Sequence, residues 1–258
     1  MRNMYLRVLP PTGAVQVSAP YFLSRRRIEK FVAENIAQIS RQRRQIQKIY
    51  PNFHYQPGEL HYLWGDLYPL RWGKAKSWSA EKTAKEIMLF LPASFYREVA
   101  HYEAAHREIA HYEIAPELNS LIYEFSSAEK KCCARALENF YRRELKVALA
   151  QVAEKYETLL GEKASEYRIR RMRTRWGSCN VDKRRIWINL QLAQLPPVCL
   201  EYVVIRELLH LKEAKHSPRF YALLEQYCPD WKQWDPNNLV TRSDFWEERN
   251  KNNGFERA

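Results

Sequence analysis

The chain has 258 residues, 46% hydrophobic and 28% charged, so it can bury the core of one large domain or of two small ones. It has no run of 18 apolar residues and no apolar leader near Met1, so we expect neither a membrane span nor a signal peptide. The net charge of +12 suggests polyanions as partners, nucleic acid first and an anionic membrane second, although net charge alone slightly favours a solvated cationic surface. The five cysteines form no C-x-x-C pair, so we expect a reducing compartment, the cytoplasm.

Residues 1–97 show the alternation of apolar and polar residues that is typical of strands. Strands are expected at five places: residues 5–9, 15–17, 59–64, 68–72 and 87–91. Between the second and third of these, Ser24 is placed to cap a helix that begins near Arg25. Residues 41–48 are basic and polar, and we assign them no element. The sequence therefore predicts a β-rich N-terminal region, an antiparallel β layer with one helix.

The periodicity becomes helical after residue 94. A helix is expected over residues 95–112, and residues 98–126 are interpreted as a helical insertion or linker. A second helix is expected from about residue 127 to residue 160, because apolar residues recur there at spacings of three and four. Gly161 follows it, in the position where glycine commonly ends a helix.

Extended structure is expected over residues 167–175, and a strand over residues 185–190. Pro196 and Pro197 then open a helix with many apolar positions. The pair Ser217-Pro218 is typical of a helix start, with serine as the cap and proline in the first turn, so a last helix is expected up to residue 227.

The helix that follows Pro197 contains Arg206-Glu207-Leu-Leu-His210, and His216 comes six residues later. In the H-E-x-x-H pattern, two histidines one helical turn apart bind zinc and the glutamate acts as general base. The pattern thus predicts His210 and His216 as metal ligands and Glu207 as the catalytic base. Arg206 occupies the first ligand position, and arginine has no lone pair to donate. It is free either to swing away or to pair with Glu207 or another carboxylate.

The spacing Glu-x-x-His alone often arises by chance, as a surface ion pair, but several further motifs accompany it. These are T-R-W-G-S-C at residues 174–179, I-N-x-x-L at 188–192, the two prolines, Y-V-V-I-R-E-L-L-H-L at 202–211 and H-S-x-x-F at 216–220. Together they resemble the YgjP-like metal-dependent hydrolases, which are related to the SprT-like and WLM zinc peptidases. The resemblance covers roughly residues 130–235 and is weaker at the N-terminus.

The resemblance implies an α+β fold whose residues 127–243 form a gluzincin-like minimal protease domain, with helices packed on a small sheet, followed by a polar tail at 244–258. It also implies zinc as the cofactor, a peptide or protein as the substrate, and a ligand histidine where this chain has Arg206. A guanidinium about 4 Å from a dication is repelled by about 4 kcal/mol per unit charge at an effective dielectric constant near 20. The sequence therefore predicts a zinc-metallopeptidase-like scaffold whose activity is impaired or lost.

The alternative prediction is a catalytically silent module that binds nucleic acid through a basic face. The residues proposed for that face are Arg170, Arg171, Arg173, Arg175, Arg184 and Arg185. Further clusters lie at residues 25–27 and 41–44. Trp176 is expected in the core and Cys179 is expected to be buried rather than nucleophilic. His101, His106 and His111 are spaced by five, which spreads them around a helix and argues against a metal site.

Overall fold

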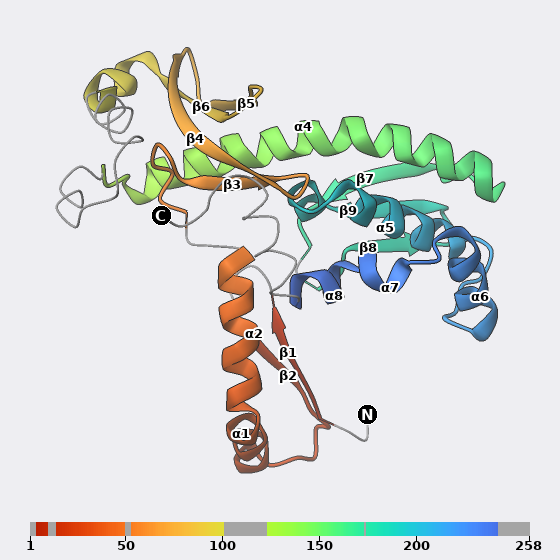
Figure 1. Ribbon diagram of the computed structural model, residues 1–258. Coiled ribbons are helices and arrows are strands. Elements are labelled where there is room, and N and C mark those ends of the chain that lie inside the picture. The colour runs from red at the N-terminus through yellow and green to blue at the C-terminus, as the bar shows by residue number, and fades with distance from the viewer. Residues whose placement is uncertain (1–3, 10–13, 50–52, 101–122, 173, 242–258) are drawn as a thin grey trace.

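The computed structural model describes residues 4–9, 14–49, 53–100, 123–172 and 174–241. Several predictions fall outside these residues: most of the helix expected at 95–112, the tail at 244–258, the three spaced histidines and Arg173. The described elements form three small sheets, the first a two-stranded hairpin, together with one long helix and several shorter ones (Figure 1). This arrangement confirms the predicted α+β class. No helix in the described part is long and apolar enough to cross a membrane.

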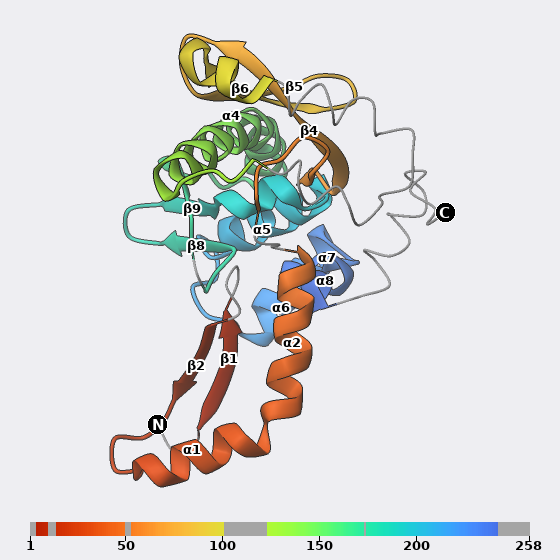
Figure 2. The same ribbon diagram turned by 90° about the vertical axis from the view of Figure 1, so that its left-hand side faces the viewer.

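The first 49 residues contribute what we call the N-terminal arm, built from two strands and two helices. Strands β1 (Tyr5–Leu9) and β2 (Ala14–Ser18) pair antiparallel, as expected from their alternation. Helix α1 (Arg25–Glu34) follows, and α2 (Ile36–Ile49) covers the basic stretch that was assigned no element. The arm projects from the rest of the molecule in both views, and α2 contacts the body at α8 (Pro236–Thr241) (Figures 1 and 2).

The second sheet has four strands: β3 (Leu60–Leu63), β4 (Asp66–Ala75), β5 (Ser79–Lys82) and β6 (Ile87–Pro92). Their order is β3-β4-β6-β5, and β4 pairs parallel with β6. The prediction of an antiparallel layer is therefore wrong for this pair. The chain first passes to the outer position of β5 and then returns as β6 between β4 and β5, so β6 runs in the direction of β4. Residues 93–100 are helical.

Helix α4 (Ser127–Leu160) has the predicted bounds and is held at both ends by local caps. Ser126 accepts a hydrogen bond from the Glu129 amide, and the Glu129 carboxylate accepts one from the Ser126 amide. Gly161 closes the other end with φ of 64°, a left-handed conformation that glycine adopts without steric cost. Residues along one face of α4, among them Phe140 and Leu145, are buried in the common core.

The third sheet and the last helices form the part that carries the motif. Strands β7 (Glu166–Arg170), β8 (Gly177–Asn180) and β9 (Arg185–Asn189) are ordered β7-β9-β8, so β8 is an edge strand. A short 3-10 helix η2 (Leu190–Gln194) leads into α5 (Pro197–Leu209), which contacts α4 and β8. Helices α6 (Pro218–Tyr227), α7 (Trp231–Trp234) and α8 complete the chain. The predicted packing of helices on a small sheet is confirmed.

Candidate active site

Helix α5 positions the motif. Pro197 occupies its first turn, where a missing amide hydrogen costs nothing, and most of its side chains are buried. His210 caps the helix with φ of −65° and ψ of −18°, so the helical path continues through it. Arg206 and His210 therefore lie one turn apart on the same side of the helix, as the H-x-x-x-H spacing requires.

The guanidinium of Arg206 is paired with the carboxylate of Glu207. Its Nη2 and Nε donate to the same oxygen, Oε1 of Glu207, at 2.6 and 3.1 Å. The exposed fractions of the two side chains are 21% and 2%, so the pair is largely shielded from solvent. Burial opposes the charge on Arg206, but the neighbouring Glu207 outweighs it and raises the arginine pKa. The guanidinium also lies over the Tyr202 ring, 5.9 Å from its centroid.

Gly177 brings the edge strand β8 into direct contact with Glu207. A Cβ at this glycine would lie 2.7 Å from Cγ and Oε1 of Glu207 and from Cγ1 of Val203. Gly177 is therefore required by the close approach of the strand to α5. The contact fixes the carboxylate between β8 and the helix.

His210 and His216 approach each other as predicted, with ring centroids 4.8 Å apart. Nδ1 of His210 faces the backbone oxygen of Glu213 at 3.3 Å, so a proton on Nδ1 leaves the Nε2 lone pair available. Phe220 stacks on His210 at 4.7 Å. Burial lowers the pKa of His210, which favours the neutral imidazole.

A protein-family model described as the YgjP-like metallopeptidase domain matches the chain in two segments, residues 2–128 and 106–237. The chain belongs to the YgjP-like metallopeptidase family. The two matched segments overlap inside the stretch interpreted as an insertion or linker. Its scaffold is accordingly that of a metal-dependent hydrolase, as the sequence predicted.

Among solved structures, this YgjP-like chain is similar to the zymogen of the metallopeptidase abylysin from Pyrococcus abyssi. The two are 22% identical, with 36% of this chain and 92% of the abylysin chain covered and a TM-score of 0.33. No curated protein matches the chain.

The donor set at the motif does not fit a three-ligand zinc centre. Two histidines are close together, but the third position offers a guanidinium, and Glu207 is already engaged by it. Within the described residues, no group of three or more His, Cys, Asp or Glu side chains is arranged to hold a metal ion. A catalytic zinc requires three protein ligands and an open position for water. At the motif, this YgjP-like chain therefore offers two neighbouring histidines and a guanidinium that is paired with Glu207.

Hydrogen bonds from Trp176 and Asn189 hold the segments next to the motif in place. Trp176 is buried, as expected, and its indole N–H donates to Asn237. Asn189 donates to the backbone oxygens of Met172 and Arg175 and so fixes the loop before β8. Burial, together with the nearby Glu207, raises the pKa of the Cys179 thiol to about 11. Cys179 is half-buried, not buried as expected, and its raised pKa disfavours the thiolate that a nucleophile requires. All five cysteines are free thiols.

The sequence missed Tyr202 as part of the site. It lies four residues before Arg206, on the same face of α5, and its hydroxyl donates to Asp235 at 3.2 Å. The spacing of four could have identified it, but an aromatic residue on a buried helix is ordinarily read as core.

Two arginines of the predicted basic face form ion pairs with glutamates of the same chain. Arg184 pairs with Glu162 at 2.7 Å, and Arg185 pairs with Glu166 at 2.6 Å. Of the remaining predicted residues that the structure describes, Arg170, Arg171 and Arg175 are exposed. The glutamates in these pairs, Glu162 and Glu166, precede the basic run in the sequence. The run of arginines therefore overestimated the unpaired positive charge of this face.

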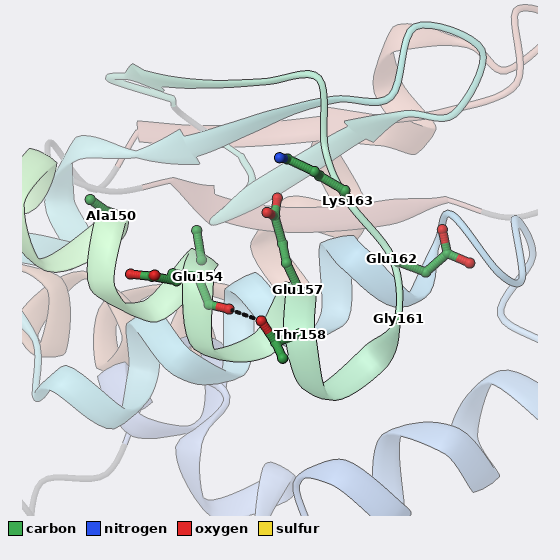
Figure 3. A pocket seen from close by; sticks show the side chains of 8 residues that line it. Ala150, Glu154, Glu157, Thr158, Gly161, Glu162 and Lys163 are labelled. Atoms are coloured by element: carbon green, nitrogen blue, oxygen red, sulfur yellow. Dashed lines mark hydrogen bonds between the residues drawn. The ribbon is translucent and has the colours of Figure 1, made fainter.

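An open cavity of about 440 Å³ lies away from the motif, at the C-terminal end of α4 (Figure 3). Glu154, Glu157 and Glu162 line it, together with the last turn of the helix. The carboxylate of Glu157 accepts hydrogen bonds from the Ala164 amide and the Tyr167 hydroxyl, so its role there is structural. None of the motif residues lines this cavity.

Proposed function

We propose that this chain is a metallopeptidase scaffold without zinc-dependent hydrolase activity, in which the Arg206–Glu207 pair stands in for the first metal ligand. The observation that carries the proposal is the contact of 2.6 Å between Nη2 of Arg206 and Oε1 of Glu207. It supplies a cation where the family has a neutral ligand. It also engages the oxygen that would have to accept a proton from water.

Two physical effects support the loss of activity. A dication beside Arg206 would be repelled by about 4 kcal/mol per unit charge, about 8 kcal/mol for its two charges, at a separation of about 4 Å and an effective dielectric constant near 20. A general base must also reach the proton that it removes, and the oxygen of Glu207 that faces Arg206 is held by two N–H donors.

The ligand that this scaffold suits best is an extended peptide. Strand β8 is the outer strand of its sheet in the described part of the chain, and Gly177 places it against Glu207. An outer strand offers unpaired backbone groups to an added strand, the general mode of β-augmentation. A peptide bound there would lie beside the motif whether or not it is cleaved.

The test is the substitution Arg206→His, with zinc content measured by mass spectrometry and hydrolysis measured on a fluorogenic peptide library. The native chain is expected to purify without stoichiometric zinc and to cleave nothing. Arg206→His is expected to bind one zinc ion and to gain chelator-sensitive hydrolysis, since His210 already presents its Nε2.

Two matched variants separate the contributions. Arg206→Gln removes the cation without adding an imidazole ligand, so it should bind no zinc tightly. The double variant Arg206→His/Glu207→Gln should bind zinc without hydrolysis, because it lacks the general base. Tight stoichiometric zinc in the native chain, or hydrolysis by it that a chelator abolishes, would refute the proposal.

A further inference from the structure

The positive charge of the protein is concentrated in the N-terminal arm. Residues 1–49 hold 10 Lys and Arg against 2 Asp and Glu, a net charge of +8 out of +12 for the whole chain. Fewer than a fifth of the residues thus account for two thirds of the net charge. Such a charge density on one projecting element creates a strong local positive potential, which attracts polyanions.

The cations of the arm are less neutralised than those of the basic face on the third sheet. Arg25 pairs with Glu29 at 2.8 Å, and Lys30 lies 3.9 Å from Glu34. The other described arginines of the two helices are exposed and form no ion pair with a described carboxylate: Arg26, Arg27, Arg41, Arg43 and Arg44. These five guanidinium groups are available to phosphates, each with a planar fork that fits phosphate oxygens.

Two aromatic rings stand beside these cations. Tyr21 is 100% exposed and Phe22 is 67% exposed, immediately before α1. Their ring centroids are 5.7 Å apart in an edge-to-face arrangement. Exposed aromatic rings next to arginines are the combination on which single-stranded nucleic acids bind, because unpaired bases stack on the rings while phosphates contact the cations.

We propose that the N-terminal arm binds single-stranded nucleic acid, with the five free arginines of α1 and α2 on the phosphates and with Tyr21 and Phe22 stacked on bases. This proposal is independent of whether the Arg206 site holds zinc. An anionic membrane fits the arm less well. The larger apolar residues of α1, Ile28, Phe31 and Val32, are half-buried, so the helix presents charges rather than an apolar face to its surroundings.

The arm holds the proposed binding site away from the body of the molecule. The arm stands away from the body in both views, and α2 contacts the body at α8 (Figures 1 and 2). The exposed arginines of α1 and α2 therefore lie on an element that projects from the rest of the molecule.

The experiment measures fluorescence anisotropy of a labelled 20-nucleotide single-stranded RNA and its DNA counterpart with the full chain. Contacts from five arginines predict a slope of log K against log salt of about −3.5, which is about a 100-fold loss of affinity between 50 and 200 mM salt. Arg26→Gln/Arg27→Gln/Arg43→Gln should weaken binding roughly 100-fold at 0.1 M salt and reduce the slope by about 2. Tyr21→Ala/Phe22→Ala should weaken it roughly 10-fold or more.

A matched control keeps the same change in net charge. Lys131, Arg135 and Lys146 are exposed on α4, so Lys131→Gln/Arg135→Gln/Lys146→Gln should leave oligonucleotide affinity within about 3-fold of the native value. Unfolding temperatures of all variants should match the native one, because the substituted side chains lie on the surface.

Four results would overturn the proposal. They are no binding at 50 mM salt, equal losses in the arm and α4 variants, equal or tighter binding to a 20-base-pair duplex, and binding only to vesicles that contain phosphatidylserine. Equal affinity for the RNA and DNA strands agrees with it, since phosphates and base faces are common to both.

Discussion

Replacing Arg206 by methionine removes the guanidinium, keeps most of the apolar length of the side chain and leaves the Glu207 carboxylate without its partner. That carboxylate is only 2% exposed and packs against Gly177, so water has little access to it. A buried charge that loses its counterion is among the costliest single changes in a protein. The variant Arg206→Met is therefore expected to unfold more easily than the native protein.

The size of the effect follows from the geometry of the pair. Two N–H groups of Arg206 contact one oxygen of Glu207 at 2.6 and 3.1 Å. Two unit charges about 4 Å apart attract by about 4 kcal/mol at an effective dielectric constant near 20. Removing one partner of a buried pair costs roughly 3–5 kcal/mol, and the 21% exposure of Arg206 places this pair at the lower end, about 3 kcal/mol.

The assay is reversible urea unfolding followed by circular dichroism, on the native chain, Arg206→Met, Glu207→Gln and the double variant. Arg206→Met should lower the free energy of unfolding by about 3 kcal/mol and the unfolding temperature by roughly 6–12 °C. In the double variant no unpaired carboxylate remains. Its loss should therefore be smaller than the sum of the two single losses by about 2 kcal/mol.

Additive losses in the cycle, within about 0.5 kcal/mol, would show that the two side chains do not interact and would refute the reasoning. An unchanged stability of Arg206→Met would do so as well. The same cycle bears on the proposed function, because a pair that contributes nothing to folding would not hold Glu207 away from water.

Two further predictions concern β8. Gly177→Ala places a Cβ 2.7 Å from Glu207 and Val203, so it should lower the free energy of unfolding by about 1–3 kcal/mol in urea titrations. A Ser178→Ala control should change it by under about 0.5 kcal/mol, and equal values for the two would contradict the close approach. The Cys179 thiol, with its pKa raised to about 11, should be roughly one part in a thousand thiolate at pH 8. Its alkylation in the folded chain, followed by peptide mass spectrometry, should rise about tenfold per pH unit above pH 8; labelling at pH 8 as fast as in urea would count against this. Because the folded pKa lies above the ordinary 9.0, the stability that this thiol contributes is present below pH 9 and is lost as the pH rises from there towards 11.

Local chemistry allowed much of the fold to be predicted. The bounds of α4 follow from its period and from Gly161, and the start of α6 follows from Ser217 and Pro218. The course of β1 and β2 follows from alternation. In each case a few neighbouring residues carry the information, because caps and helical faces depend on side chains within about four positions.

Strand pairing could not be predicted in the same way. The parallel pairing of β4 with β6 depends on β5 taking the outer place in the sheet, a choice made between segments that are distant in the chain. The short strand β5 was missed because four residues carry too little alternation to identify. The helix α2 was missed because most of its residues are basic or polar, although its few apolar residues lie on one face.

The sequence by itself determined which residues meet at the motif: Arg206 beside Glu207, and His210 beside His216. Helical spacing places residues four positions apart on one side of α5, and the short turn after His210 brings His216 back beside it. Only the tertiary structure decided what Arg206 does there. The burial of Glu207 beneath Gly177 leaves a carboxylate charge that requires a partner, and the guanidinium of Arg206 supplies it. The charge of a basic run was likewise settled in three dimensions, where glutamates pair with Arg184 and Arg185 of the third sheet and leave most described arginines of the N-terminal arm without an ion pair to a described carboxylate.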